Sequence, residues 1–341
     1  MNPGKWHKQS LYQQPEKGNN VHCQLCPHHC VIREGMTGIC KTRVNKQGVL
    51  YSMAYGNPCS VCIDPIEKKP LFHYLPGERI FSLATPGCNL HCLNCQNWEI
   101  SQVSPEKINR YDLMPAEVVQ QAMGHHCHLI AFTYTEPTVY YEYMFDIAQL
   151  AHKKGMKCVL ISNGYINPQP LLDLCPWLDA ANIDLKCFDE AIYRSLCGGS
   201  LQPVLHTLKT LKEQGVWLEI TNLIIPGYTD DMEMIQAMCQ WLMENGFQDT
   251  PLHFSRFFPT YKLSQVNPTP KATLIEAEEV AKKAGIRYVY IGNLADTGYE
   301  HTCCPHCHRT VVERDGFQII HNRVTDGQCS FCGTPLPGVW S

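Results

Sequence analysis

The chain has no long hydrophobic run and few charged residues. None of its 341 residues lies in an apolar stretch of 18, so we expect no membrane span. The first ten residues, MNPGKWHKQS, lack the apolar core of a secretory signal, so we expect a cytoplasmic protein. Charged residues make up 18%, below the usual share of about 25%. The chain shows no long repeat and no low-complexity segment.

The net charge of −4 is unevenly distributed. Residues 1–75 hold 9 Lys and Arg against 4 Asp and Glu, which gives +5, so the remaining residues carry −9. A segment of +5 falls well short of the basic surface that nucleic-acid binding requires. We therefore disfavour a zinc-dependent nucleic-acid adaptor and expect no nucleic acid among the partners.

Cysteine, in contrast, is abundant, with 20 in the chain. In a cytoplasmic protein so many cysteines indicate metal binding before disulfides, and they suggest an anaerobic or strongly reducing cell. Eleven of them fall into three groups, and Cys59 and Cys62 form an isolated Cys-x2-Cys pair. We expect most of the other seven to be small buried apolar residues. The three groups are Cys23, Cys26, Cys30 and Cys40; Cys88, Cys92 and Cys95; and Cys304, Cys307, Cys329 and Cys332.

Residues 76–298 alternate short apolar runs with amphipathic stretches, the pattern of βα units around a parallel sheet. Six or seven such units predict an α/β fold with a partial or complete TIM-like barrel, and a doubly wound sheet is the alternative. Helices are expected at 115–124, 138–154, 204–214, 230–244 and 273–284. The expected strands are Arg79–Ala84, Leu129–Thr133, Lys157–Ser162, Ala180–Leu185, Trp217–Ile225, Leu252–Phe257 and Arg287–Ile291.

Three further segments flank this barrel. Residues 1–20 are polar and without pattern, which predicts a flexible tail. Residues 21–75 are rich in turns and cysteines and form an expected N-terminal metal-binding module. Residues 299–341 form an expected C-terminal module of the zinc-ribbon or rubredoxin type.

The run PGCNLHCLNCQ places Cys88, Cys92 and Cys95 in a Cys-x3-Cys-x2-Cys pattern directly after the first barrel strand. A [4Fe-4S] cluster has four irons, each of which takes a thiolate, and this run offers three. The pattern therefore predicts a cluster with one open iron, and open metal positions are where chemistry takes place. A zinc knuckle or a chance cluster of cysteines is the alternative.

Polar residues stand at the ends of the following strands, where barrel enzymes place their working groups. Thr135 and Glu136 follow the second strand, and a carboxylate there can bind an ammonium group. Each group also has a structural interpretation, namely a loop glutamate, a tight turn, an ion pair or a satisfied core histidine. The further candidates are Ser162 and Asn163 after the third strand, Asp184 and Lys186 at the fourth, and His253 in the sixth.

The two flanking cysteine sets predict metal sites of a different kind. Cys304-x2-Cys307 and Cys329-x2-Cys332 offer four thiolates, which closes a structural zinc or iron site. The Cys23, Cys26, Cys30 and Cys40 set could hold a structural zinc or a second iron–sulfur cluster, or remain free thiols. His22, His28 and His29 lie among these cysteines and are alternative ligands.

Together these features resemble the radical S-adenosylmethionine (SAM) enzymes in order and spacing. The resemblance implies that the open iron binds SAM, that Glu136 contacts the SAM amino group, and that Asn163, Asp184 and Lys186 contact its ribose and carboxylate, as in pyruvate formate-lyase activating enzymes. Tyr134 and Thr135 replace the two glycines of the family motif. The runs PIEKKPLFHYLPG, QNWEIS, FTYTEPT, HFSRFFP, YVYIGN and PGVW are similar to the radical SAM component of the AmmeMemoRadiSam system.

The resemblance implies a radical SAM oxidoreductase that cleaves SAM reductively. It implies a flavodoxin or ferredoxin as reductant, a 5′-deoxyadenosyl radical that abstracts hydrogen from an unidentified substrate, and Memo-like and AMMECR-like partner proteins. No catalytic side chain is implied, since the cofactor carries the hard step. A glycyl radical enzyme activase is the alternative within this class, and an iron–sulfur electron-transfer protein is the alternative of another class.

Overall fold

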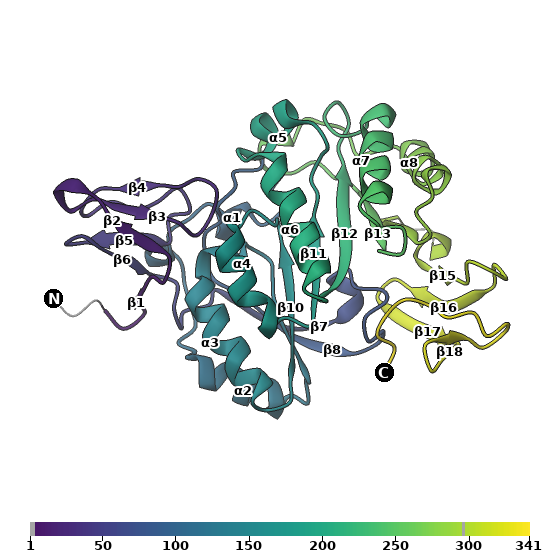
Figure 1. The fold of residues 1–341 in the computed structure, drawn as a ribbon, viewed down its shortest axis with the longest axis horizontal. Coiled ribbons are helices and arrows are strands. Elements are labelled where there is room, and N and C mark those ends of the chain that lie inside the picture. The colour runs from purple at the N-terminus through teal and green to yellow at the C-terminus, as the bar shows by residue number, and fades with distance from the viewer. Residues whose placement is uncertain (1–3, 295–296) are drawn as a thin grey trace.

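A single eight-stranded sheet forms the centre of the protein in the computed structural model, which describes residues 4–294 and 297–341 (Figure 1). Its last seven strands are parallel and follow one another in chain order, and β7 adds an antiparallel edge. Within the described residues the edge strands β7 and β14 do not pair, so the barrel is partial. A doubly wound sheet would reverse its strand order, and the sequential order excludes it. The strands are β7 Ser60–Pro65, β8 Arg79–Ala84, β9 Leu129–Phe132, β10 Lys157–Ser162, β11 Ala180–Asp184, β12 Trp217–Ile224, β13 Leu252–Arg256 and β14 Val289–Gly292.

Helices connect the parallel strands and cover the outside of the sheet, with α3 packed on β10, α6 on β12 and α8 on β13 and β14. The seven strands expected from the sequence agree with the observed bounds within two residues. Three short helices, α1, α4 and α5, were not expected, because four to eight residues are too few to show a helical period. The helices are α1 Trp98–Ser101, α2 Pro115–Gly124, α3 Tyr141–His152, α4 Pro168–Leu174, α5 Glu190–Cys197, α6 Leu201–Glu213, α7 Met232–Glu244 and α8 Lys271–Ala284.

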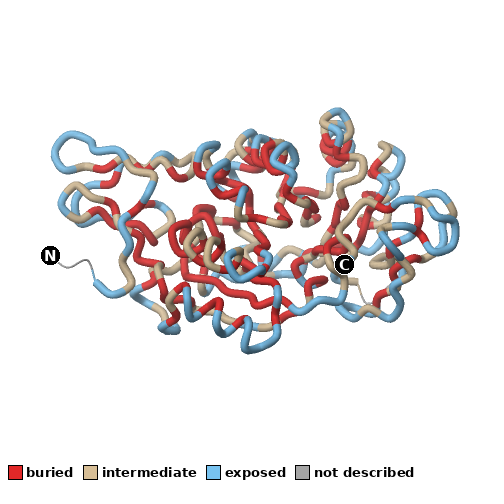
Figure 2. Tube along the Cα trace, turned by 60° about the horizontal axis from the view of Figure 1, so that its bottom comes forward, coloured by how far each residue is buried: buried red, intermediate tan, exposed pale blue. Residues whose placement is uncertain are grey.

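Burial follows this layering. All four residues of β9 are buried, and the buried stretches of the trace run through the middle of the molecule in Figure 2. A strand covered on both faces reads as a continuous apolar run, which explains why the strands were recognisable from the sequence. Among the described residues, no helix has both the length and the apolar character needed to cross a membrane.

The N-terminal residues form two small three-stranded sheets, ordered β1-β6-β5 and β2-β3-β4. This corrects the expectation of a flexible tail over residues 1–20, because β1 and β2 pair with later strands. Backbone hydrogen bonds hold such strands without an apolar pattern, so the sequence carried no signal for them. Residues 1–3 lie outside the described part of the chain. The strands are β1 Lys8–Gln9, β2 Gln13–Pro15, β3 Val21–Cys23, β4 Val31–Ile32, β5 Arg43–Lys46 and β6 Val49–Ser52.

A buried ion pair fixes this N-terminal module to the barrel. Arg43 of β5 donates two hydrogen bonds, of 3.0 and 2.8 Å, to the carboxylate of Glu142 on α3. Both side chains are 1% exposed. Removing either partner would leave a buried charge without compensation, which typically costs about 3–5 kcal/mol.

The C-terminal module carries one three-stranded sheet and one short hairpin. The hairpin turn is Asp326-Gly327, with φ of 51° and 70°, the left-handed pair that a two-residue turn requires. The strands are β15 Thr302–Cys303, β16 Thr310–Asp315, β17 Gln318–Asn322, β18 Val324–Thr325 and β19 Gln328–Cys329.

This module docks on the segment that precedes β8, at the end of the barrel where the parallel strands begin. The segment pairs with the last residues of the chain, because Leu75 N donates to Val339 O and Val339 N donates to His73 O. The His73 ring stacks on Trp217, the first residue of β12. The runs PIEKKPLFHYLPG and PGVW, which are far apart in the sequence, therefore meet at this end.

Candidate functional site

The three cysteines of the predicted cluster lie in the loop between β8 and α1, at the carboxyl end of β8. The loop is pinned to α5 by two backbone bonds, His91 N to Cys197 O at 2.8 Å and Leu93 N to Leu196 O at 2.9 Å. Within the described residues, these three sulfurs do not form a group tight enough for a single ion, whereas the four C-terminal cysteines do. A tetrahedral zinc would bring thiolates to ~3.8 Å. The three cysteines therefore lack the spacing of a single-zinc site.

The local environment distinguishes the three thiols. Burial raises the pKa of Cys88 and of Cys95. A hydrogen bond from Cys197 lowers the pKa of Cys92 to about 7, against the opposing effect of burial. Bound metal requires thiolates and would release these protons. Cys197 was expected to be only a small buried apolar residue, and nothing in the sequence signalled its position beside Cys92.

Glu136 is buried just beyond the end of β9, and its carboxylate is extensively hydrogen-bonded. It accepts hydrogen bonds from Thr138 N, Thr138 Oγ1 and Ser162 Oγ on one oxygen, and from Asn163 N on the other, all between 2.7 and 2.9 Å. Oε1 therefore takes three bonds and Oε2 takes one, which leaves Oε2 an acceptor position that an ammonium group can use. The side chain also connects the ends of β9 and β10.

The turn before Glu136 keeps a glycine-like backbone although it contains no glycine. Tyr134 has a φ of 61°, a left-handed conformation that costs a non-glycine residue roughly 1–2 kcal/mol. Its hydroxyl donates to Asp64 on β7, and the Lys69 ammonium lies 4.7 Å from the centre of its ring. The Tyr134 carbonyl accepts a 2.6 Å hydrogen bond from Asn97 Nδ2, next to the cysteine loop. The phenol thus anchors a strained turn at the mouth of the barrel.

Asn163 connects the end of β10 to the cysteine loop. Its side-chain nitrogen, Nδ2, donates to Asn89 Oδ1 at 2.9 Å and lies 3.8 Å from the sulfur of Cys88. Ser162 Oγ is used by Glu136, and Thr135 Oγ1 donates to Thr85 O at 2.7 Å. The structure thus brings Thr135, Ser162 and Asn163 to one end of the sheet, where they hold the loop in place.

Asp184 and Lys186, at and just beyond the end of β11, form an ion pair of 3.0 Å. The Asp184 side chain is 40% exposed and that of Lys186 is 23% exposed, so both keep a face open to a ligand. Burial alone would lower the pKa of Lys186, but Asp184 and Cys92 raise it well above its ordinary value. Lys186 is therefore a fixed positive charge beside the cysteine loop.

Several buried polar atoms around this edge have no hydrogen-bond partner among the described residues. Buried polar atoms in native proteins are almost always paired with the chain, water, an ion or a ligand, so these atoms are available to a bound molecule. Tyr193 lies close enough to Lys186 and Cys92 to interact electrostatically with both. Asn222 Nδ2 donates to Leu185 O at 2.7 Å. The unpaired atoms are Thr85 Oγ1, Asn94 Oδ1, Tyr193 Oη and Asn222 Oδ1.

His253 does not belong to this site. Its Nε2 lies 2.6 Å from Glu219 Oε2, and its ring contacts Phe72 and Tyr290. Glu219 also accepts hydrogen bonds from the backbone of Phe72 and His73, the segment on which the C-terminal module docks. Its side chain is therefore satisfied within the core, and the expectation of a cofactor contact at His253 is corrected.

The four C-terminal cysteines have the arrangement that a closed metal site requires. The sulfurs of Cys304 and Cys332 lie 3.7 Å apart, as do those of Cys307 and Cys329. These distances match the ~3.8 Å edge of a tetrahedron with metal–sulfur bonds of 2.3 Å. Four thiolates leave no open position, so this centre can support folding but offers no site for a substrate.

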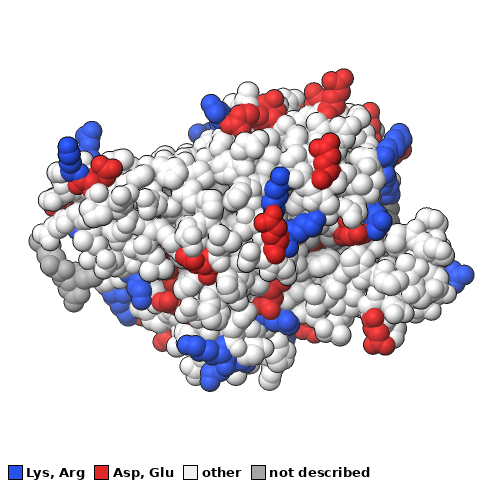
Figure 3. Space-filling model, in the orientation of Figure 1, with Lys and Arg blue, Asp and Glu red and all other residues white. Residues whose placement is uncertain are grey.

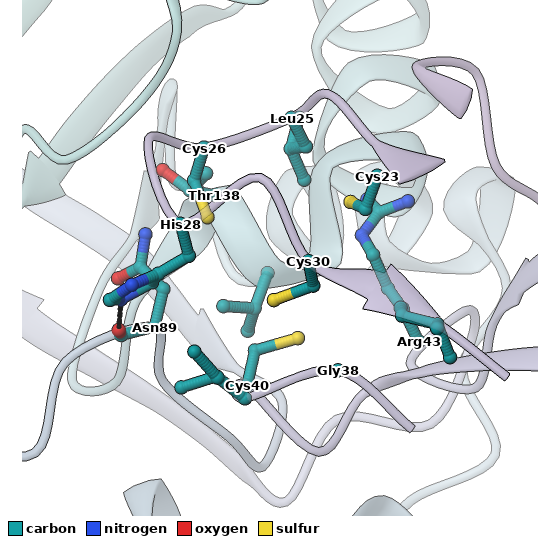
Figure 4. A pocket seen from close by; sticks show the side chains of 13 residues that line it. Cys23, Leu25, Cys26, His28, Cys30, Gly38, Cys40, Arg43, Asn89 and Thr138 are labelled. Atoms are coloured by element: carbon teal, nitrogen blue, oxygen red, sulfur yellow. Dashed lines mark hydrogen bonds between the residues drawn. The ribbon is translucent and has the colours of Figure 1, made fainter. Parts of the chain in front are cut away.

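The N-terminal cysteines Cys23, Cys26, Cys30 and Cys40 line one cavity with the barrel residues Asn89, Thr138 and Val139 (Figure 4). Of the histidines among them, His28 turns its Nε2 to Asn89 O at 2.6 Å, and the rings of His22 and His29 contact each other. The cavity thus adjoins the loop that carries Cys88.

Comparison with known proteins agrees with this geometry. A sequence profile of the radical SAM superfamily matches residues 82–242, which span β8 to α7. An uncharacterized protein of Methanocaldococcus jannaschii is 45% identical over 96% of this chain and 98% of its own length. Residues 82–242 therefore form a radical SAM domain. The pyruvate formate-lyase 1-activating enzyme of Escherichia coli is 23% identical over 63% of this chain and 93% of its own length. The SAM-bound structure of Streptococcus suis SuiB has a TM-score of 0.49 and 14% identity, covering 73% of this chain and 56% of SuiB.

A radical SAM domain implies a [4Fe-4S] cluster and SAM, and the residues present fit both groups. Three thiols lie in one loop at the carboxyl edge of the sheet, and the thiol of Cys197 on α5 lies beside that of Cys92. The half-open Asp184–Lys186 pair and the unpaired oxygens supply charge and hydrogen bonds for a polar ligand. The radical SAM signature was readable from the cysteine spacing, whereas Cys197, Asn89 and Tyr134 had no comparable signal.

Proposed function

We propose that the protein is a cytoplasmic radical SAM oxidoreductase whose cluster, held by Cys88, Cys92 and Cys95, binds SAM at its open iron. When bound, the cluster and SAM supply a one-electron reductive cleavage that releases methionine and a 5′-deoxyadenosyl radical for hydrogen abstraction. The observation that carries the proposal is the three-thiol loop at the edge of the sheet, next to a charged pair that remains partly exposed.

The chain's own residues have binding and positioning roles. Asp184 and Lys186 present opposite charges 3.0 Å apart, which suits a ligand that carries both an ammonium and a carboxylate. Glu136 and Asn163 keep the strand ends and the cysteine loop in register. The strained turn at Tyr134 presents its backbone towards the same edge. No side chain is required as a general base.

The partners follow from the resemblance to the AmmeMemoRadiSam system and remain part of the proposal. We expect a flavodoxin or ferredoxin to supply the electron, and Memo-like and AMMECR-like proteins to act with the enzyme. Lys, Arg, Asp and Glu are interspersed over much of the face shown in Figure 3.

A glycyl radical enzyme activase is the second candidate. It is favoured by the names of three relatives, the pyruvate formate-lyase 1-activating enzyme and the activating enzymes of indoleacetate decarboxylase and 4-hydroxyphenylacetate decarboxylase. In that case the hydrogen would be taken from a backbone glycine of a partner enzyme. The two candidates share the chemistry at the cluster and differ in the substrate.

Anaerobic reconstitution followed by reduction with dithionite tests the proposal. The reduced protein should show an electron paramagnetic resonance (EPR) signal that changes when SAM is added, and SAM should be converted to 5′-deoxyadenosine and methionine. Replacing Cys88, Cys92 and Cys95 together by Ala should abolish both results, whereas Cys127→Ala should retain them. A signal that saturating SAM leaves unchanged would instead favour the electron-transfer protein.

Adding the Memo-like and AMMECR-like proteins, or a candidate glycyl radical enzyme, separates the two candidate functions. Faster formation of 5′-deoxyadenosine with the first pair supports the AmmeMemoRadiSam assignment. A glycyl radical EPR signal on the second partner supports the activase.

A further inference from the structure

The four N-terminal cysteines surround a space that suits a cluster better than a single ion. The centre of a water molecule can occupy about 20 Å³ inside the cavity. When the ~1.4 Å radius of water is added, the empty space corresponds to a sphere of about 3 Å radius. A single zinc would draw the thiolates to ~3.8 Å and leave no such void. The C-terminal centre of the same chain does show that tight spacing, and among the described cysteines the N-terminal set does not.

The wall of the cavity is suited to a redox centre. Leu25, Ile32 and Val139 make it largely apolar, and an apolar surrounding keeps solvent from a cluster. Arg43 also lines the cavity, is 1% exposed, and leaves its Nε without a partner while its other two nitrogens bind Glu142. An N–H group at the wall can donate to a cluster sulfur, one of the interactions that set a cluster's potential. In Figure 4 the Arg43 guanidinium lies beside Cys23.

The cavity touches the catalytic loop on both sides of Cys88. On one side, His28 Nε2 lies 2.6 Å from the carbonyl oxygen of Asn89. On the other side, a Cβ placed on Gly87 would lie 2.8 Å from the carbonyl oxygen of Cys40 and 2.3 Å from Thr42 Cγ2, so only glycine fits. The two cysteine sets are therefore packed backbone to backbone at this point.

The connection between the two sets is short. His28 is two residues from both Cys26 and Cys30, a separation of at most about 7 Å between Cα atoms. One hydrogen bond then leads to Asn89, which is bonded to Cys88 through the chain. Thr138 provides a second contact between the cavity and the site at the cysteine loop, since it lines the cavity and also donates to Glu136.

We propose that Cys23, Cys26, Cys30 and Cys40 hold a second iron–sulfur cluster that relays electrons to the cluster at Cys88, Cys92 and Cys95. This inference rests on the proposed function, because it needs an electron acceptor at the second set. One electron passes from a reduced flavodoxin or ferredoxin to the N-terminal cluster, and then to the catalytic cluster. The donor is oxidised by one electron and the N-terminal cluster returns to its starting state. No bond breaks until the electron reaches SAM.

The first experiment uses the full chain with Cys88, Cys92 and Cys95 replaced by Ala. After anaerobic reconstitution it should retain about four labile sulfides per chain, half of the unsubstituted protein's content, and an EPR signal that SAM does not alter. Any labile sulfide in this variant cannot come from the C-terminal centre, because a single ion held by four thiolates contains no sulfide. Absence of sulfide, or zinc in its place, would overturn the proposal.

The second experiment removes two ligands of the other set, in the variant Cys26→Ala with Cys30→Ala. It should lose half of the sulfide, keep the SAM-sensitive EPR signal, and be reduced by flavodoxin at least tenfold more slowly. Dithionite, a small reductant, should still reduce its remaining cluster. Cys239→Ala on α7 is the control, since Cys239 is a buried cysteine distant in sequence from both sets. Reduction by flavodoxin at the unsubstituted rate would overturn the relay.

The two proposals fail in distinguishable ways. SAM cleavage by the unsubstituted protein, with no sulfide in the triple variant, would overturn only the second cluster. Sulfide in the triple variant, with no SAM cleavage by the unsubstituted protein, would overturn the proposed function. If the double variant does not fold, the sulfide content and EPR of the unsubstituted protein and of the triple variant still decide whether the second cluster exists.

Discussion

His73 Nδ1 and the carbonyl oxygen of Pro337 lie 2.8 Å apart, which joins the segment before β8 to the end of the chain. The other ring nitrogen lies 2.6 Å from the hydroxyl of Tyr290 on β14. A carbonyl oxygen can only accept, so Nδ1 carries the proton and Nε2 accepts from the phenol. The imidazole is therefore held neutral between the two partners, and the C-terminal module is locked to the barrel by that tautomer.

The first prediction concerns the effect of pH on this contact. Burial lowers the pKa of His73 from 6.5 to about 4, and the nearby Arg314 acts in the same direction, while Glu219 opposes it. Between those values the unfolded chain binds a proton that the folded chain does not, so the free energy of unfolding falls as the pH drops from 6.5 to 4. The loss is up to about 3 kcal/mol. Chemical denaturation at several pH values in this range should show that the free energy of unfolding of His73→Gln falls less steeply with decreasing pH. A fall as steep as that of the unsubstituted protein would contradict this account.

The second prediction tests whether the C-terminal centre, which we expect to hold zinc, stabilises the fold without taking part in SAM cleavage. Cys307→Ser should reduce the zinc content by about one equivalent per chain and expose residues 303–341 to protease, because the metal supplies much of the module's stability. SAM cleavage per folded molecule should persist. Cys303→Ser is the matched control, since Cys303 is exposed in the same module and lies outside the four-thiolate group. A variant that kept its zinc and its protease resistance would refute the scaffold role.

The third prediction concerns the partly exposed ion pair. Asp184→Asn and Lys186→Met should each weaken SAM binding by about 1–3 kcal/mol, the usual effect of losing a charged hydrogen-bond partner. Cluster assembly should be retained, because neither side chain is a thiolate ligand. Titration of the EPR change with SAM measures the affinity. Lys154→Met, an exposed lysine after α3, is the control, and affinities equal to it in both variants would remove this pair from the SAM site.

The fourth prediction concerns Glu136, whose four hydrogen bonds should stabilise the fold. In Glu136→Gln an amide N–H₂ replaces an oxygen that accepts a hydrogen bond, so a buried donor faces another donor. We expect a loss of about 1–3 kcal/mol in the free energy of unfolding. Glu213→Gln, an exposed substitution on α6, is the control. If Glu136→Gln retained full stability but lost SAM affinity, the carboxylate would be a ligand contact and not a structural one.

The fifth prediction tests the hydrogen bond between Cys197 and Cys92. A thiol that donates to a cluster thiolate favours the reduced and more negative cluster, so Cys197→Ala should lower the reduction potential. One such bond corresponds to at most about 60 mV. Redox titration followed by EPR measures the shift, and Cys175→Ala is the control for loss of a buried cysteine. An unchanged or raised potential would show that the bond does not reach the cluster.

The sequence by itself determined the barrel and the cysteine loop. Short runs that are mostly apolar mark the strands, so their positions follow from the local sequence, and the spacing of Cys88, Cys92 and Cys95 carries its own chemistry. The four-thiolate spacing at the C-terminus likewise predicted a closed metal centre, because the ligands lie close together in the chain. Short-range patterns of this kind need no knowledge of the fold.

Only the tertiary structure decided which polar side chains remain available. His253 stands in a strand and Glu136 follows one, as the sequence indicated, yet both side chains are hydrogen-bonded to residues distant in the chain, Glu219 and Asn163. The contact between His28 and Asn89 joins residues 61 positions apart. Hydrogen-bond saturation and loop-to-loop packing depend on such long-range neighbours, and no local pattern encodes them.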